Sequence, residues 1–157
     1  QAGLHIYCGL EFRTTTSDND YLLFGAAPEL LYSTPELHRY TIPQLRALAD
    51  REGLLLVQAH PFRTGLTRED PALLDGVEVF NGNARHDSHN DDALRFAREN
   101  GLLFFSGSDH HETEDRGRGG MMLPREPKDE ADLVRLLPSA GLLPDILLEF
   151  FPVKPEK

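Results

Sequence analysis

The chain contains a single cysteine and no tryptophan. One thiol, Cys8, excludes an intramolecular disulfide and a zinc site built from several cysteines. Its presence in an apolar stretch is typical of a small buried hydrophobic residue, and we expect a reducing, cytoplasmic compartment. No apolar run approaches the roughly 18 residues needed to span a bilayer, and the basic-then-apolar start of a signal peptide is missing. We therefore expect no membrane partner.

Basic residues are scarce: 16 Lys and Arg stand against 26 Asp and Glu, giving a formal net charge of -10. A field of this sign repels nucleic acid, so we expect no strong nucleic-acid binding. The chain also lacks a Walker loop, a dinucleotide fingerprint and a serine-nucleophile elbow. Residues 117–120 are glycine-rich, but no Lys-Ser or Lys-Thr pair follows them. Nucleotide-loop chemistry is therefore unsupported.

What the chain does have is an alternation of helical patterns and short apolar runs within 157 residues, of which 39% are hydrophobic. This length and composition predict one domain, residues 1–157. The alternation predicts an α/β fold with a mainly parallel sheet, in either a layered or a barrel architecture. The patterns predict strands at 4–12, 21–24, 54–59, 77–80 and 102–105, helices at 41–52, 91–100 and 129–137, and a short helix or turn at 69–74.

Potential ligands follow the predicted strands. Glu11, His60 and Asn81 each end one strand, and Asp109 and His111 follow another. Loops at the carboxyl ends of parallel strands converge on one face, where such folds bind ligands. Imidazole nitrogen and carboxylate oxygen together suit divalent metals such as zinc and manganese.

Each residue taken alone also has a plain structural interpretation. His60 precedes Pro61 and can mark a turn, Asp109 can cap a helix, and Glu11 can be a solvated strand end facing Arg13. Arg13 and Arg63 lie close in sequence to the candidate ligands and could bind phosphate through paired hydrogen bonds, although isolated arginines are commonly surface charges. We expect Arg63, Asn81 and Arg13 to contact substrate.

Five stretches taken together resemble the polymerase-and-histidinol-phosphatase (PHP) family. They occur in the order found in that family and extend over nearly the whole chain. The stretches are Gly9-Leu10-Glu11, Tyr21-Leu22-Leu23-Phe24-Gly25, Ala59-His60-Pro61-Phe62-Arg63, Val77-Glu78-Val79-Phe80-Asn81-Gly82 and Ser106-Gly107-Ser108-Asp109-His110-His111.

The resemblance implies a distorted seven-stranded β/α barrel that binds two or three divalent ions, usually zinc, manganese or iron, and hydrolyses phosphoesters. In this chain we therefore expect a partial or distorted β/α barrel. By that analogy Glu11 bridges two metals, and His60, Asp109 and His111 complete their coordination. Asp20 stands where the family usually has histidine. It could bind a metal through a carboxylate oxygen, or it could mark a metal ligand that this chain has lost.

The family begins with a His-x-His strand followed by an Asp-His pair, and nothing before Leu4 provides either. The chain starts with Gln1 rather than methionine, so we expect its N-terminal strands to be missing. Without those strands, one edge of the parallel sheet would be uncovered. The sequence could be truncated, another chain could cover the edge through self-association, or the remaining residues could pack in an altered arrangement.

These patterns favour a metal-dependent phosphoesterase that acts on a small phosphorylated substrate through metal-activated water. One alternative is a non-catalytic, truncated or degenerate PHP-like domain that binds a partner through its open sheet edge. A second is a related amide-cleaving metallohydrolase, because such barrels share strand-end His and Asp ligands.

Overall fold

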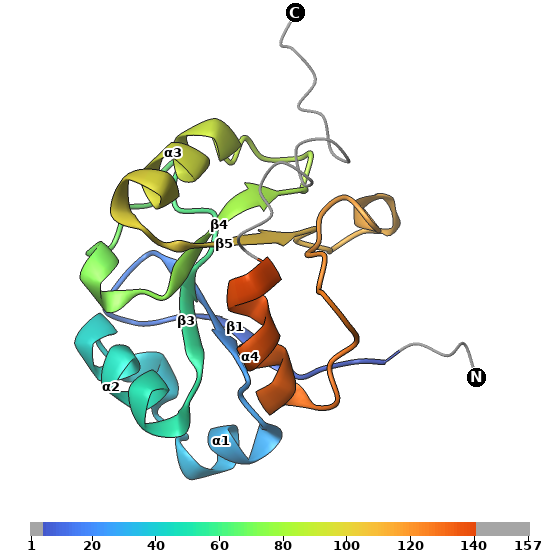
Figure 1. Ribbon diagram of the computed structural model, residues 1–157. Helices are drawn as coiled ribbons and strands as arrows, with labels where there is room; N and C mark the ends of the chain where they lie inside the picture. The colour runs from blue at the N-terminus through green and yellow to red at the C-terminus, as the bar shows by residue number, and fades with distance from the viewer. Residues whose placement is uncertain (1–4, 141–157) are drawn as a thin grey trace, which may run out of the picture.

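The computed structural model describes residues 5–140, which form one sheet with helices on both sides (Figure 1). Short 3-10 helices occupy Leu37–Arg39, Pro71–Leu73 and Thr113–Asp115. The strands are β1 (Gly9–Arg13), β2 (Asp20–Phe24), β3 (Leu55–Gln58), β4 (Gly76–Asn81) and β5 (Leu103–Gly107), and the α-helices are α1 (Pro28–Ser33), α2 (Ile42–Glu52), α3 (Asn90–Asn100) and α4 (Glu130–Ala140).

Most predicted elements are present within a few residues of their expected bounds. The first strand is shorter than predicted, because it begins at Gly9 and not at residue 4, which lies outside the described residues. The helix α1 was not predicted. Its six residues bury only Leu30, so they are too few to show a helical repeat in the sequence.

The five strands form an open, mixed sheet in the order β1-β2-β3-β4-β5. Strand β2 is antiparallel to β1 and β3, whereas β3, β4 and β5 run parallel. The expected partial or distorted barrel is therefore wrong for residues 5–140, because β1 and β5 lie at opposite edges of the sheet and closure would require them to pair. The reason is local: residues 14–19 are too few for the crossover that a parallel pair needs, so β1 and β2 form a hairpin.

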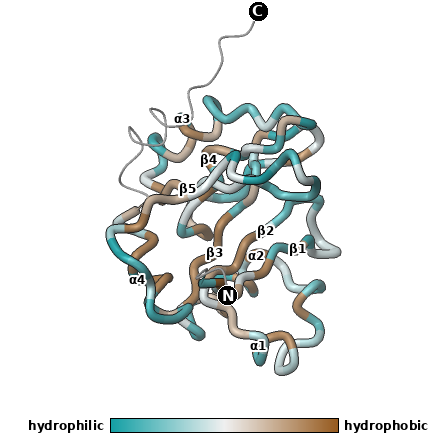
Figure 2. The backbone as a smooth tube through the Cα atoms, turned by 90° about the vertical axis from the view of Figure 1, so that its right-hand side faces the viewer, coloured by the Kyte–Doolittle hydropathy of each residue, from teal (hydrophilic) through white to brown (hydrophobic). Residues whose placement is uncertain are grey.

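Two apolar cores flank the sheet. On one face, Leu45 of α2 and Ala97 of α3 pack with Leu56 of β3. On the other face, Leu133 and Leu137 of α4 pack around the opposite side of the sheet. Hydrophobic residues run along β2 and β3 between these layers (Figure 2). Burial of apolar side chains from both faces therefore fixes the middle of the sheet and leaves its ends for polar residues.

The ends of α2 follow the sequence signals closely. The backbone N–H of Thr41 donates to Gln44 Oε1 at 2.9 Å, which satisfies a group that lacks an intrahelical partner. Gly53 ends the helix in the left-handed conformation, with φ +68°. The chain therefore turns directly into β3, the strand that leads to His60.

Gly25 provides a test of how α4 packs on the sheet. It has φ +87°, and a Cβ placed there would lie 2.5 Å from Cγ2 of Val134 in α4. Gly101 also has a positive φ, +65°, but a Cβ there would meet nothing within 4 Å. We expect Gly25→Ala to lower the free energy of unfolding by about 1–3 kcal/mol more than Gly101→Ala does, measured by urea denaturation. Equal losses would contradict this packing of α4.

Candidate functional site

The sheet topology brings the candidate ligands to one end of the sheet, where the parallel strands terminate. His60 follows β3, Asn81 is the last residue of β4, and Asp109 follows β5, so all three lie at the carboxyl ends of parallel strands. Asp20 is the first residue of β2. Because β2 runs antiparallel to β3, the beginning of β2 lies beside the carboxyl end of β3. Four segments far apart in the sequence therefore meet here.

His60 lies at the centre of this group. Its side chain is only 3% exposed, and its Nε2 atom is 3.7 Å from Asp20 Oδ2 and 3.8 Å from Glu11 Oε1. Its Nδ1 atom is buried and has no hydrogen-bond partner among the described residues. Burial, together with the nearby positive charge of Arg63, lowers the pKa of His60. The imidazole is therefore neutral near pH 7 and keeps a lone pair available to a ligand.

The carboxylates around His60 differ in their environments. The pKa of Glu11 is raised, first by desolvation and then by the negative charges of Asp109 and Asp20. Burial alone would raise the pKa of Asp109, but hydrogen bonds from Arg63 and Asn81 outweigh burial and hold that pKa below its ordinary value. Asp109 stays ionised as a result, and it adds to the negative potential at Glu11.

Backbone conformation also marks two of these residues. His60 has φ +28° and Asp109 has φ +46°, values in the left-handed region that non-glycine residues rarely adopt. Arg63 Nη2 and the Asn81 and Asn83 amides all donate to Asp109 Oδ2, at 2.8, 3.2 and 3.3 Å. These contacts compensate for the strained conformation and aim the carboxylate into the group.

Glu78 is a central residue that the sequence analysis did not single out. It is buried within β4, and its Oε2 accepts hydrogen bonds from the His60 backbone N–H and the Asn81 amide, both at 3.0 Å. Desolvation, with smaller contributions from Asp109 and Glu11, raises the pKa of Glu78 to about 7. A glutamate between Val77 and Val79 in a buried strand was the signal, since burying a charge there is costly without a purpose.

The remaining predicted residues lie around this centre. The Asn81 amide bridges Glu78 and Asp109, so its N–H groups hold carboxylates in place. His111 is 66% exposed on the following loop, with its Nδ1 3.3 Å from Asp109 Oδ1. Arg63 is bound to Asp109, and Arg13 is bound to Asp20. The structure thus brings together Glu11, Asp20, His60, Arg63, Asn81 and Asp109, with His111 at the rim.

The loop that carries His111 is fixed by two residues that sequence reasoning missed. The buried carboxylate of Asp115 accepts hydrogen bonds from the backbone N–H groups of His111 and Glu112, at 2.9 and 2.8 Å. Arg85 binds the same carboxylate through two parallel hydrogen bonds. These bonds hold the pKa of Asp115 well below its ordinary value, so the anchor persists at any physiological pH.

The donors suit a divalent metal in their chemistry, but the described residues do not form a complete site. No group of three or more His, Cys, Asp or Glu side chains within residues 5–140 is arranged to hold a metal ion. Two of the carboxylates, Asp20 and Asp109, are bound to arginines instead. The neutral imidazole of His60 and the crowded charge at Glu11 fit a cation nevertheless, because positive charge would relieve the repulsion among the carboxylates.

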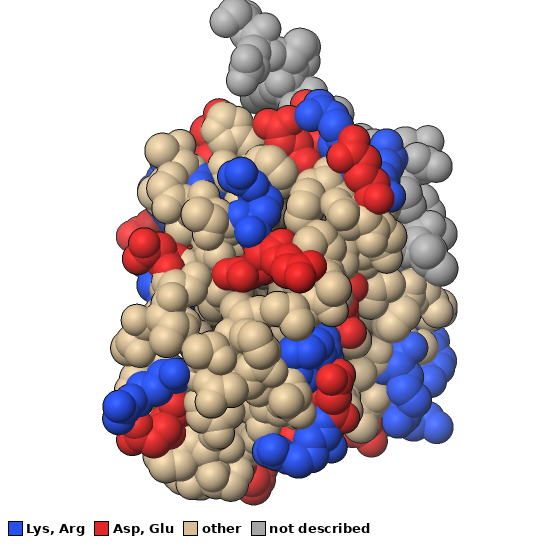
Figure 3. All heavy atoms as spheres, turned by 90° about the vertical axis from the view of Figure 1, so that its left-hand side faces the viewer, with Lys and Arg blue, Asp and Glu red and all other residues tan. Residues whose placement is uncertain are grey.

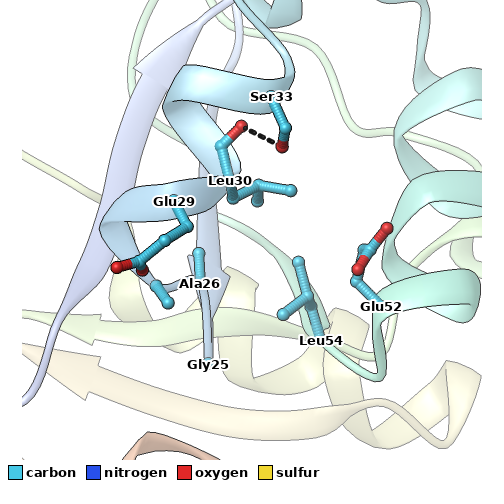
Figure 4. Close-up of a pocket in the computed structure, with 8 residues that line it drawn as sticks. Gly25, Ala26, Glu29, Leu30, Ser33, Glu52 and Leu54 are labelled. Carbon is cyan, nitrogen blue, oxygen red and sulfur yellow. Dashed lines mark hydrogen bonds between the residues drawn. The ribbon is translucent and has the colours of Figure 1, made fainter.

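Figure 3 shows acidic and basic side chains interspersed over one face. Two hollows are lined by other residues. A cavity of about 460 Å³ is lined by residues that include Ser17, Thr67 and Glu69, and one of about 360 Å³ lies between α1 and the start of β3, with Leu30 and Leu54 between Glu29 and Glu52 (Figure 4). Neither is lined by the residues around His60.

Comparison with known proteins supports the resemblance seen in the sequence. Residues 87–139 match the PHP-associated family. This PHP-associated stretch contains α3, β5 and most of α4, and it includes Asp109, His111 and Asp115. It is consistent with the C-terminal region of a PHP protein. Glu11, His60 and Asp20 lie outside the matched residues.

The fold also has a counterpart among solved structures. The crystal structure of PsfC from Pseudomonas syringae PB-5123 is similar, with a TM-score of 0.70 and 20% sequence identity. The alignment covers 96% of this chain and 67% of the PsfC chain, and at this identity it concerns the fold alone. No curated protein matches the chain in sequence. In the described part of the chain, no helix combines the length and apolarity that a membrane crossing requires.

The raised pKa of Glu78 predicts a pH dependence of stability. A folded-state pKa of about 7, above the ordinary 4.5, means that folding favours the protonated form. Its stabilising effect is complete below about pH 4.5 and is lost as the pH rises through 7. We expect Glu78→Gln, which cannot ionise, to gain up to about 3 kcal/mol of unfolding free energy relative to wild type between pH 4.5 and 8. Urea denaturation with a metal chelator present measures this difference.

The exposed Glu99 supplies the control for that measurement. Its replacement in Glu99→Gln should leave the pH dependence as it is in wild type, since its side chain lies in solvent. A Glu78→Gln curve that runs parallel to wild type over the whole range would show that Glu78 ionises normally in the folded protein.

Proposed function

We propose that this chain is part of a metal-dependent phosphoesterase of the PHP type, acting on a small phosphorylated substrate. The observation that carries the proposal is the convergence of Glu11, Asp20 and Asp109 on His60, near the carboxyl ends of the parallel strands. Three segments far apart in the sequence, namely the β1–β2 hairpin and the residues after β3 and β5, bring three carboxylates and an imidazole together. A structural explanation of any single residue does not account for this convergence.

The four residues would hold zinc, manganese or iron, with His111 contributing from the rim. A divalent cation bound there supplies positive charge to phosphate oxygens and acidifies a water molecule. His60 is suited to this role because its lowered pKa leaves the imidazole unprotonated at neutral pH. Glu78 holds the His60 backbone, and Asn81 holds Asp109, so both act as positioning residues.

Arg63 is the residue best placed to contact a phosphate group. Its Nη2 atom donates to Asp109 Oδ2 at 2.8 Å, and its side chain is 19% exposed. Its Nε atom is buried without a partner among the described residues. A guanidinium supplies hydrogen-bond donors to an anion, which the neighbouring ionised carboxylates cannot do, so Arg63 would orient the substrate.

A second function is favoured by one observation. Since residues 5–140 contain no complete metal-binding group, the site would need ligands from elsewhere. The edge strands β1 and β5 each pair with one neighbour among the described residues and could accept a further strand. The alternative is therefore a non-catalytic PHP-like domain that binds a partner through a sheet edge and holds little metal.

The experiment that tests the proposal compares hydrolysis of a model phosphomonoester in zinc, manganese or iron. We expect His60→Ala and Asp109→Asn to lower kcat/KM at least about a hundredfold, because each removes a ligand and not a surface group. His38→Ala, at an exposed histidine outside the site, is the control and should retain wild-type activity. Circular dichroism checks that the variants are folded.

Two results would count against the phosphoesterase. Full metal-dependent activity in His60→Ala and Asp109→Asn would show that the reaction occurs elsewhere. A folded wild-type protein that binds no metal by elemental analysis and hydrolyses no phosphoester would favour the non-catalytic alternative.

A further inference from the structure

Arg13 and Asp20 form an ion pair across the β1–β2 hairpin. The strand register places the two residues directly opposite each other. Arg13 Nε donates to Asp20 Oδ1 at 2.9 Å, and Nη2 donates to Oδ2 at 2.8 Å. The guanidinium therefore engages both carboxylate oxygens in the two-pronged geometry that arginine and carboxylate favour. Both carboxylate oxygens of Asp20 are engaged in this pair.

The same carboxylate faces the candidate metal site. Asp20 Oδ2 is both the acceptor from Arg13 and the atom 3.7 Å from His60 Nε2. The Asp20 side chain is 18% exposed and that of Arg13 is 53% exposed, so Asp20 is the more buried partner of the pair. A metal ion bound between Asp20 and His60 would have to share Asp20 Oδ2 with the Arg13 guanidinium, which already donates to it.

Glu11 shows that this compensation is specific to Asp20. It lies two residues before Arg13 on β1, so its side chain is on the same face of the sheet. Its Oε1 atom lies 3.8 Å from His60 Nε2, so it faces the same group as Asp20. Arg13 Nε and Nη2 both donate to Asp20, and among the described residues no hydrogen bond or ion pair joins Arg13 to Glu11. The hairpin thus neutralises one carboxylate of the group and leaves the other crowded.

We infer that Arg13 is a built-in competitor for Asp20, so that a divalent metal ion binds this carboxylate only when the guanidinium is displaced. The inference rests on the proposed function, in that it takes the group around His60 to be a metal site. Arg13 then lowers metal affinity in the resting protein. Once displaced, it becomes a mobile positive charge at the rim of the site, where an anionic substrate would arrive.

The competing explanation predicts the opposite sign. If Arg13 merely holds Asp20 in the orientation that a metal needs, its removal should weaken metal binding. If Arg13 competes for the oxygens, its removal should strengthen binding, because an exposed ion pair and a repulsive charge both disappear. The direction of the change in affinity therefore separates the two explanations without any measurement of catalysis.

The experiment is a titration of the protein with Mn²⁺ alone, with free Mn²⁺ followed by electron paramagnetic resonance. We expect Arg13→Gln to bind Mn²⁺ roughly three- to tenfold more tightly than wild type. Arg39→Gln is the matched control, since it removes the same charge from an ion pair with Glu36 that is exposed on the surface. Its affinity should stay within about twofold of wild type.

A double variant shows whether the gain passes through Asp20. In the Asp20→Asn background, Arg13→Gln should no longer tighten Mn²⁺ binding, because the contested carboxylate is gone. A gain that persists without the carboxylate would overturn the inference. So would an Arg13→Gln affinity equal to that of Arg39→Gln, or weaker than wild type.

Failure of the underlying proposal gives a different pattern. If wild type, Arg13→Gln and Arg39→Gln all leave Mn²⁺ free in solution, the metal site itself is absent and the inference fails with it. If wild type binds Mn²⁺ and loses it in Asp109→Asn, the site stands, and only the comparison at Arg13 decides whether the guanidinium competes.

Discussion

The hydrogen bonds accepted by Glu78 connect the ends of three neighbouring strands. Through Oε2, this buried carboxyl group binds the backbone N–H of His60 beyond β3 and the amide of Asn81 at the end of β4. The same amide reaches Asp109 beyond β5. Apolar packing sets the spacing of the strands, but it cannot orient groups past their ends. The Glu78 network performs that second task, and the arrangement of the candidate site depends on it.

Charge compensation follows from the same crowding. Four carboxyl groups and an imidazole occupy a volume that burial keeps partly away from water, so each negative charge raises the cost of its neighbours. The protein reduces this cost in three ways: Glu78 favours its protonated form, Arg63 binds Asp109, and Arg13 binds Asp20. Among the described residues no arginine is bound to Glu11, and burial together with Asp109 and Asp20 raises its pKa, so an added cation would stabilise its charged form.

The sequence predicted the local elements well and the global arrangement poorly. The helix at 42–52 carried its own signals in Thr41, Gln44 and Gly53, and the buried strand after it was a continuous apolar run. Those signals act within a few residues. Whether strands close into a barrel depends on pairing between the first and last strands, and no local pattern specifies that pairing. The barrel expectation therefore came from the resemblance, while the six-residue β1–β2 connection determined a hairpin and an open sheet.

The sequence by itself determined which residues could be ligands, because hydrophobic runs mark the strands that His60 and Asp109 follow, and the side chains of these two residues and of Glu11 can bind metals. The prediction that Glu11 ends its strand was wrong, since it lies in the middle of β1. It could not determine what those ligands contact. The Arg13 pair depends on the hairpin register, and the roles of Glu78 and Asp115 depend on hydrogen bonds across gaps of 18 and 30 residues in sequence. Only tertiary structure decides such contacts, since a shift of one residue in strand register would turn each side chain to the opposite face of the sheet.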